Sequence, residues 1–211
     1  AIWGDTFSTK PPASQTDGSV WNGTYSGVWH LNTTNLLDST ANRHHGVGKA
    51  PQGYTPPGVI SNGAIGTGLW LDPNERQYVD FGGVNLGLAG DHSFALAAWV
   101  RRAHYRDGDC TVSWGGPGVT NHFGLLSWHD GSIITAPDKT NAVPWITTGA
   151  WQYVVLTYNA SNHQKTLYVD GVPRSTYGIA GMNLPANEYL WLGRYVAGSR
   201  YASDEGNYGL Y

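Results

Sequence analysis

The stretch Trp151-Gln-Tyr-Val-Val-Leu-Thr-Tyr-Asn159 is rich in aromatic and β-branched residues, and the run Lys165-Thr-Leu-Tyr-Val169 follows it after a short polar link. Runs of this composition predict strands, and in the second run one face is more apolar than the other. The dipeptide Asp170-Gly171 comes next, directly before Val172. Asp-Gly between two such runs is the strongest short-range signal for a two-residue hairpin. The region therefore predicts antiparallel strands joined by tight turns.

The same pattern extends along the rest of the chain. Asp130-Gly131 predicts a second hairpin, and Phe94–Val100 is apolar throughout, as a strand covered on both faces would be. No window of about 11 residues shows helical periodicity without a Gly or Pro, so helices should be at most a turn or two. A strand-rich chain without helices must bury one sheet against another, which predicts an all-β fold, an antiparallel β-sandwich or jelly roll. The expected strands are Gly27–Leu31, Ala64–Leu71, Gln77–Phe81, Ser93–Arg101, Thr111–Trp114, His122–Trp128, Ser132–Thr135, Gln152–Tyr158, Lys165–Val169 and Tyr189–Gly193.

Length and composition narrow the classes of function. The 211 residues suit one large domain with an appendage, which we divide into an N-terminal strand and linker (1–23) and a jelly-roll domain (24–211). Only 13% of the residues are charged and the net charge is −3, so there is no basic surface for a nucleic-acid partner. No apolar run approaches the roughly 20 residues that span a bilayer, which argues against direct membrane insertion. The single cysteine, Cys110, reads as a small buried hydrophobe.

Five ordered blocks carry a resemblance to a known family. They are Val28–Asn32 with Leu37–Asn42 and His44–Gly46, Ala64–Asp72 with Tyr78–Phe81, Ser93–Val100, Trp151–Asn159 with Leu167–Val172, and Leu190–Arg194. Together they resemble the laminin G-like jelly rolls of the concanavalin A-like lectin/glucanase superfamily, over roughly Gly27 to Arg194. The resemblance implies the concanavalin A-like jelly-roll fold.

The end of the chain departs from that family. Its members close with a strand, whereas this chain runs Ala202-Ser-Asp-Glu-Gly-Asn-Tyr-Gly-Leu-Tyr211. We expect Glu205–Tyr211 to form the closing strand in shortened form. In the alternative, Ala1–Trp3 of another copy fills the open sheet edge, which would make the protein self-associate by strand donation.

For function, the resemblance implies a non-catalytic recognition module, carbohydrate-binding and lectin-like, within a larger surface or secreted protein. Its partner would be a glycan or a cell-surface protein, and its location extracellular or at the cell surface. A structural or filament-forming adhesin domain is the alternative, and a polysaccharide-degrading enzyme of the same fold ranks third. Retaining glycosidases need two carboxylates about 5–5.5 Å apart, and none of the three glutamates, Glu75, Glu188 and Glu205, begins such a motif.

Aromatic residues outside the strand blocks are the candidate sugar platforms. Trp114, Trp128 and Trp145 lie at strand ends or in loops, where an exposed indole can stack on a sugar while His129 and Asp130 bond its hydroxyls. In the alternative, these indoles fold back to cap the sandwich. The tryptophans inside the strand blocks should belong to the core: Trp29, Trp70, Trp99, Trp151 and Trp191.

A calcium ion is the one cofactor that the resemblance implies. Calcium takes six to eight oxygen ligands, which loops rich in Asp and Asn supply. By resemblance the ligands would be Asp38 and Asn42, helped by Asp204 and Asn207 before the chain end. The alternative is that Asp38 and Asn42 only form an Asx-turn.

Overall fold

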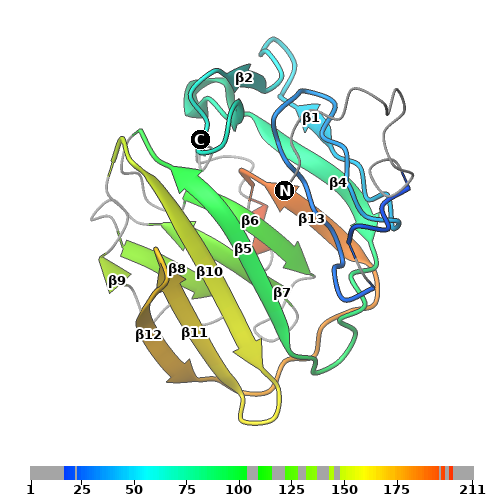
Figure 1. Cartoon of the computed structure of the whole chain (residues 1–211), viewed down its shortest axis with the longest axis vertical. Coiled ribbons are helices and arrows are strands. Elements are labelled where there is room, and N and C mark those ends of the chain that lie inside the picture. Colours follow the sequence, from blue (N-terminus) through cyan, green and yellow to red (C-terminus); the bar gives the residue numbers. More distant parts are fainter. Residues whose placement is uncertain are drawn as a thin grey trace, which may run out of the picture.

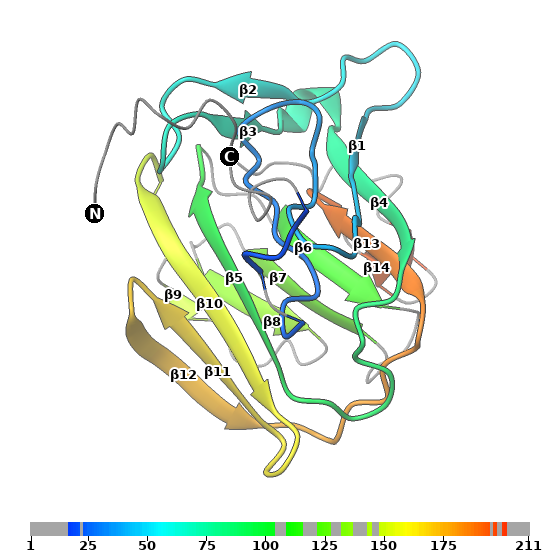
Figure 2. The same cartoon turned by 45° about the vertical axis from the view of Figure 1, so that its right-hand side comes forward.

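The computed structural model describes residues 17–21, 23–103, 109–115, 122–127, 132–136, 143–144, 148–194, 196–197 and 200–201. Two antiparallel sheets face each other in these residues, as Figures 1 and 2 show. The described helical structure is a single 3-10 turn, Pro73–Glu75. Within the described residues, no helix is long and apolar enough to cross a membrane. The predicted all-β sandwich is therefore confirmed.

The larger sheet has seven strands. Their order across the sheet is β1 (Val47–Lys49), β4 (Tyr78–Val84), β13 (Glu188–Leu192), β6 (Asp109–Gly115), β7 (His122–Ser127), β8 (Ser132–Ala136) and β9 (Val143–Pro144). Strand β13 is inserted between β4 and β6, so segments more than a hundred residues apart become neighbours. This crossover brings residues from β4 and β13 onto one surface.

The smaller sheet has four strands, in the order β12 (Val172–Gly178), β11 (Gln164–Val169), β10 (Trp151–Asn159) and β5 (Phe94–Arg101). Two further pairs lie outside these sheets: β2 (Gly58–Ile60) with β3 (Gly68–Trp70), and β14 (Val196–Ala197) with β15 (Arg200–Tyr201). The predicted hairpin at Asp170-Gly171 joins β11 to β12. Both turn residues have positive φ, 53° and 77°, as a type I′ turn requires.

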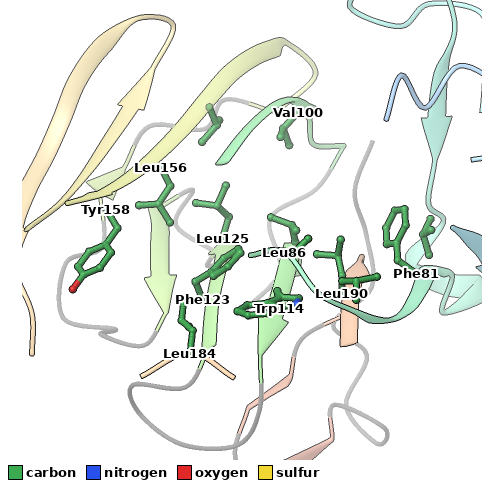
Figure 3. Packing of buried hydrophobic residues seen from close by; sticks show 14 of the residues in the cluster. Phe81, Leu86, Val100, Trp114, Phe123, Leu125, Leu156, Tyr158, Leu184 and Leu190 are labelled. Carbon is green, nitrogen blue, oxygen red and sulfur yellow. The ribbon is translucent and has the colours of Figure 1, made fainter. Parts of the chain in front are cut away.

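The core lies between the two sheets. Leu156 from the smaller sheet faces Trp114, Leu125 and Leu190 from the larger one (Figure 3). These four residues and Leu167 of the smaller sheet are each at most 4% exposed. Burying such a continuous apolar layer is the main driving force for the sandwich. Cys110, on β6, is fully buried as expected.

Several expectations about strands are corrected. Gly27–Leu31 forms no strand and contributes only the bridge between Trp29 and Asp38, because the Val28 N–H donates to the Asp38 carboxylate instead of to a neighbouring strand. Strand β5 is covered on one face only, since Ala95, Ala97 and Trp99 are exposed. Trp99 is 46% exposed and packs at 5.2 Å against Tyr153, so it is not a core residue.

The chain ends lie largely outside the described residues. This applies to Ala1–Trp3 and to Glu205–Tyr211, so neither the closing strand nor strand donation is tested. Of the expected linker, residues 17–21 are described. Gly18 is packed so closely on the backbone of Thr40 and Ala41 that a Cβ there would come within 2.7 Å of both, so this piece of the linker rests on the body of the domain.

A hydrogen-bonded cluster ties the β10–β11 hairpin to the segment before β5. The Tyr158 hydroxyl donates to Asp91 Oδ1 at 2.6 Å, and His163 Nε2 lies 3.0 Å from Asp91 Oδ2. Burial, together with the hydrogen bond to Asp91, raises the pKa of Tyr158 to about 12. The phenol therefore holds its proton more tightly in the folded chain than in the unfolded one, where the pKa is about 10.

This cluster leads to a prediction for Tyr158→Phe. Removing the hydroxyl takes one donor from Asp91 and should lower the free energy of unfolding by about 1–2 kcal/mol at neutral pH. A group with a raised folded pKa stabilises fully below its unfolded pKa, and this stabilisation is lost as pH rises toward the folded value. Wild type should therefore lose stability between about pH 10 and 12 more steeply than the variant. Urea denaturation across that range measures it, with Tyr168→Phe as the control; parallel wild-type and Tyr158→Phe curves would contradict it.

Candidate functional site

Trp114 is not a sugar platform. Its side chain is 0% exposed and packs against Phe123 in the core, with ring centroids 5.5 Å apart. The side chain of Trp114 points from β6 into the core, and Trp114 pairs with Leu190 of β13. The sequence interpretation placed it at a strand end, but β6 continues to Gly115 and keeps the indole inside the sandwich.

The other predicted ligand-binding residues lie outside the described part of the chain. These are Trp128, His129, Asp130 and Trp145. Two of the predicted calcium ligands, Asp204 and Asn207, also lie outside it. Their roles stay predictions.

Asp38 is the centre of a hydrogen-bond network. Its side chain is 5% exposed. Oδ1 accepts the backbone N–H groups of Val28 at 3.0 Å and Thr40 at 2.9 Å, while Oδ2 accepts the Thr40 hydroxyl at 2.9 Å and the His44 N–H at 3.0 Å. Burial alone would raise the pKa of Asp38, but the hydrogen bonds from Val28, Thr40 and His44 outweigh it and hold the pKa below its usual value. The carboxylate is thus a buried anion that organises three segments of backbone.

This geometry does not fit a calcium ligand at Asp38. Each carboxylate oxygen already accepts two hydrogen bonds, which uses its lone-pair directions. Asn42 donates its amide to the carbonyls of Tyr25 and Ser26, at 3.3 and 3.1 Å. Among the described residues, no group of three or more His, Cys, Asp or Glu side chains could hold a metal ion.

Calcium binding can be measured directly through its effect on stability. If these hydrogen bonds are kept in solution, the melting temperature should be the same in excess calcium and in excess chelator. An ion bound elsewhere, with Asp204 and Asn207, would instead stabilise the fold by mass action, by about 2.7 kcal/mol at a hundredfold excess over its dissociation constant. Differential scanning calorimetry in the two conditions distinguishes these outcomes, with magnesium as the control for ionic strength.

The outer face of the larger sheet carries an aromatic cluster that we call the Tyr189 patch, formed by Tyr78, Asp80, Tyr189, Trp191 and Arg194. The Tyr189 ring is 50% exposed and stacks on Trp191, with centroids 5.4 Å apart. The Trp191 indole N–H donates to Asp80 Oδ1 at 3.0 Å. The guanidinium of Arg194 lies over Trp191 at 4.4 Å and over Tyr78 at 4.9 Å, which are favourable cation–π distances.

The backbone around the Tyr189 patch is shaped to leave space beside the exposed ring. Tyr189 pairs with Gly83, and the register shifts between Tyr189 and Trp191. Gly82 has φ of 71°, and no atom lies within 4 Å of where a Cβ would stand on Gly82 or Gly83. Asp80 Oδ1 also accepts the Gly82 N–H at 2.8 Å, which holds this irregularity in place. Such bulges often re-aim side chains at functional surfaces.

The Tyr189 patch can offer three kinds of contact to a ligand. The Tyr189 ring gives an apolar stacking face, the Asp80 carboxylate accepts hydrogen bonds, and the Arg194 guanidinium supplies positive charge. The carbonyl of Arg194 accepts the Ser113 hydroxyl at 2.6 Å, which fixes the arginine over β6. A rigid aromatic face with convergent polar groups is suited to binding.

The sequence interpretation missed this patch, although a signal was present. In Glu188-Tyr-Leu-Trp-Leu192, strand alternation places Tyr189 and Trp191 on the face opposite Leu190 and Leu192. Trp191 is buried, at 5% exposed, as expected, but it lies outside the apolar cluster between the sheets to which Leu190 belongs. What the pattern could not show is the partner, because Asp80 lies 111 residues earlier in the chain.

Fold and sequence together define the class of the protein. The chain belongs to the concanavalin A-like lectin/glucanases superfamily, which it matches over residues 73–204. No curated protein is significantly similar to the sequence.

Solved structures show the same fold. Domain 4 of AbnA, a GH43 extracellular arabinanase from Geobacillus stearothermophilus, was solved with arabinotriose; it has a TM-score of 0.64 and 18% identity, over 88% of each chain. An HCR/D mutant has a TM-score of 0.53 and 13% identity, over 89% of this chain and 48% of that chain. The Ruminococcus gnavus IT-sialidase CBM40, bound to α2,6-sialyllactose, has a TM-score of 0.45 and 14% identity, over 78% of this chain and 91% of that one. At these identities the likeness to the first two structures, whose TM-scores exceed 0.5, establishes the fold alone.

Proposed function

We propose that this domain is a non-catalytic carbohydrate-binding module of a larger surface or secreted protein, and that it binds glycan at the Tyr189 patch. The observation that carries the proposal is the half-exposed Tyr189 ring, stacked on Trp191 beside Asp80 and Arg194. An aromatic ring packs against the C–H face of a sugar, and charged side chains make strong hydrogen bonds to its hydroxyls. Superfamily membership and the structural likeness to AbnA domain 4, solved with arabinotriose, support the same function.

A non-catalytic role is favoured by how two of the described carboxylates, Glu75 and Asp80, are used. Glu75 Oε2 accepts the Thr55 N–H at 2.9 Å and the Thr55 hydroxyl at 3.2 Å, which ties the segment at Thr55 to the 3-10 turn that contains Glu75. In the Tyr189 patch, Asp80 Oδ1 accepts hydrogen bonds from the Trp191 indole N–H and the Gly82 N–H. Asp80 is the one carboxylate among the five residues of the patch. A retaining glycosidase would need a second carboxylate about 5–5.5 Å away.

The test is glycan binding by wild type and Tyr189→Ala. A glycan array that includes arabinotriose and sialyllactose identifies the ligand, and isothermal titration calorimetry measures its affinity. Loss of the stacking ring should weaken binding by about tenfold or more, which corresponds to about 1.4 kcal/mol. Tyr189→Phe keeps the ring and should retain most of the affinity.

Tyr153→Ala is the matched control, because Tyr153 is a 36% exposed tyrosine on the other sheet. Its glycan affinity should equal that of wild type. An array on which wild type binds no glycan would contradict the function, whereas binding that survives Tyr189→Ala would contradict only the site.

A structural or adhesin role is the second candidate, and the exposed Trp99–Tyr153 pair favours it. These two rings lie 5.2 Å apart on the outer face of the smaller sheet, with Ala97 exposed beside them. A flat apolar face of this kind suits packing against a neighbouring domain. The same titrations separate the two functions, since a purely structural domain would bind no glycan.

A further inference from the structure

A small pocket lies on the loop that precedes the first strand. It has a volume of about 270 Å³ and is lined by His30, Leu31, Asn32, Thr33, Asn35, Leu36, Leu37 and Ser39. This volume is just below the roughly 300–1,000 Å³ of pockets that hold drug-sized ligands, so it suits a ligand of about one ring. The pocket belongs to residues 30–39, whereas the superfamily match begins at residue 73.

The chemistry of the lining selects an uncharged ligand that is rich in hydroxyls. Its polar groups are two amides, two hydroxyls and one imidazole, and three leucines supply the apolar part. None of the residues lining this pocket is Asp, Glu, Lys or Arg. An anionic sugar would have no cation to pair with there, and leaving such a charge unpaired at a partly apolar site is unfavourable.

An aromatic rim stands next to the polar lining. Trp21 packs against His30, which lines the pocket, with ring centroids 6.2 Å apart. Trp21 also makes an edge contact with Tyr25 at 5.1 Å, and the Tyr25 side chain is 46% exposed. His30, which lines the pocket, thus belongs to an aromatic cluster that borders the amides and hydroxyls of the lining.

The loop that forms the pocket is held in an unusual conformation. Leu31 and Leu36 have φ of 53° and 47°, in the left-handed region that residues with a side chain rarely adopt. Both leucines line the pocket. The conformation is maintained by contacts on either side: the Gly46 N–H donates to the Leu36 carbonyl at 2.9 Å, and the Thr67 hydroxyl donates to the Asn32 carbonyl at 2.7 Å. Residues kept in such strained states by their surroundings are concentrated at binding sites.

We infer that this pocket is a second carbohydrate site, which takes a single uncharged sugar ring, independently of the Tyr189 patch. Asn32 and Asn35 bond the hydroxyls of the ring, and the leucines of the lining pack against its apolar face. The two sites belong to different parts of the chain, residues 30–39 here and strands β4 and β13 for the patch. A glycan long enough to reach both would gain avidity without any new contact.

The test is an NMR titration of the full chain with glucose, galactose, arabinose and N-acetylglucosamine, and with glucuronate as the anionic comparison. At least one neutral sugar should shift the backbone amides of residues 30–39, and glucuronate should shift them less. Asn35→Ala removes one amide of the lining from an exposed position and should weaken binding of the neutral sugar by about tenfold. Asn74→Ala removes an exposed asparagine that does not line the pocket, and it should have no effect.

Each contrary result overturns a defined part of the inference. If no neutral sugar shifts residues 30–39 at millimolar concentration, the pocket is not a sugar site. Tighter binding of glucuronate than of every neutral sugar would overturn the uncharged class. Independence is tested with Tyr189→Ala, which should leave the shifts at residues 30–39 unchanged; their loss would show that the two sites are one. Failure of the Tyr189 patch to bind glycan leaves these readouts intact, so the two proposals fail separately.

Discussion

Trp114→Ala is expected to lower the free energy of unfolding by about 3–5 kcal/mol, the usual cost of removing a buried tryptophan. The indole is completely buried between the two sheets and packs on Phe123 (Figure 3). Phe123 in turn stacks on Phe94 of the opposite sheet, with ring centroids 4.6 Å apart. Alanine would leave a cavity that this rigid strand pairing cannot close. Guanidinium denaturation followed by circular dichroism measures the loss.

Trp99→Ala is the matched control, because Trp99 is 46% exposed and its main contact is the ring of Tyr153. We expect it to cost about 1 kcal/mol or less, the range of a cross-strand pair. If Trp114→Ala proves too unstable to purify, Trp114→Phe keeps part of the volume and should show an intermediate loss. Equal, small losses for Trp114→Ala and Trp99→Ala would contradict the burial described here.

These two tryptophans show which part of the fold the sequence can predict. The strands at Trp151–Asn159 and Gln164–Val169 and the Asp170-Gly171 hairpin depend on local composition, and the structure confirms them, whereas the expected strand at Gly27–Leu31 does not form. Successive side chains of a strand point to opposite faces. A tryptophan therefore points outward when its immediate neighbours in the strand point into the core. Trp99 alternates with Ala98 and Val100 and therefore points outward. The alternation within each strand, more than the presence of a strand, distinguishes the exposed Trp99 from the buried Trp114.

The candidate sites were less accessible to sequence reasoning because they depend on contacts between distant segments. Asp80 and Trp191 meet only because β13 is inserted beside β4. The pocket at residues 30–39 depends on a loop with two leucines at positive φ, which no residue preference predicts. Asp38 was singled out from the sequence, yet its carboxylate is bonded to backbone N–H groups and a hydroxyl, a role that the spacing of the motif could not distinguish from metal binding.

Asp38→Ala should be the most disruptive change outside the core, with a loss of about 3 kcal/mol in the free energy of unfolding. Truncation leaves the N–H groups of Val28, Thr40 and His44 without their buried acceptor, and each such group costs about 1–3 kcal/mol before relaxation. Asp38→Asn keeps one oxygen, which can still accept from Val28 and Thr40, but presents an NH2 group to the donors that Oδ2 served. It should lose about half as much.

The pH dependence of Asp38 distinguishes a bonded carboxylate from a loss of packing. Hydrogen bonds hold the pKa of Asp38 below its usual value of about 4 in the folded chain, so in acid the unfolded chain binds the proton first. The stabilisation is therefore complete above about pH 4 and is lost as pH falls through the lower, folded pKa. The gap in stability between wild type and Asp38→Asn should be constant from about pH 5 to 7 and should narrow below about pH 4. Urea denaturation at a series of pH values measures the gap, and a gap that stays the same down to the acid limit would mean that the charge of Asp38 does not stabilise the loop.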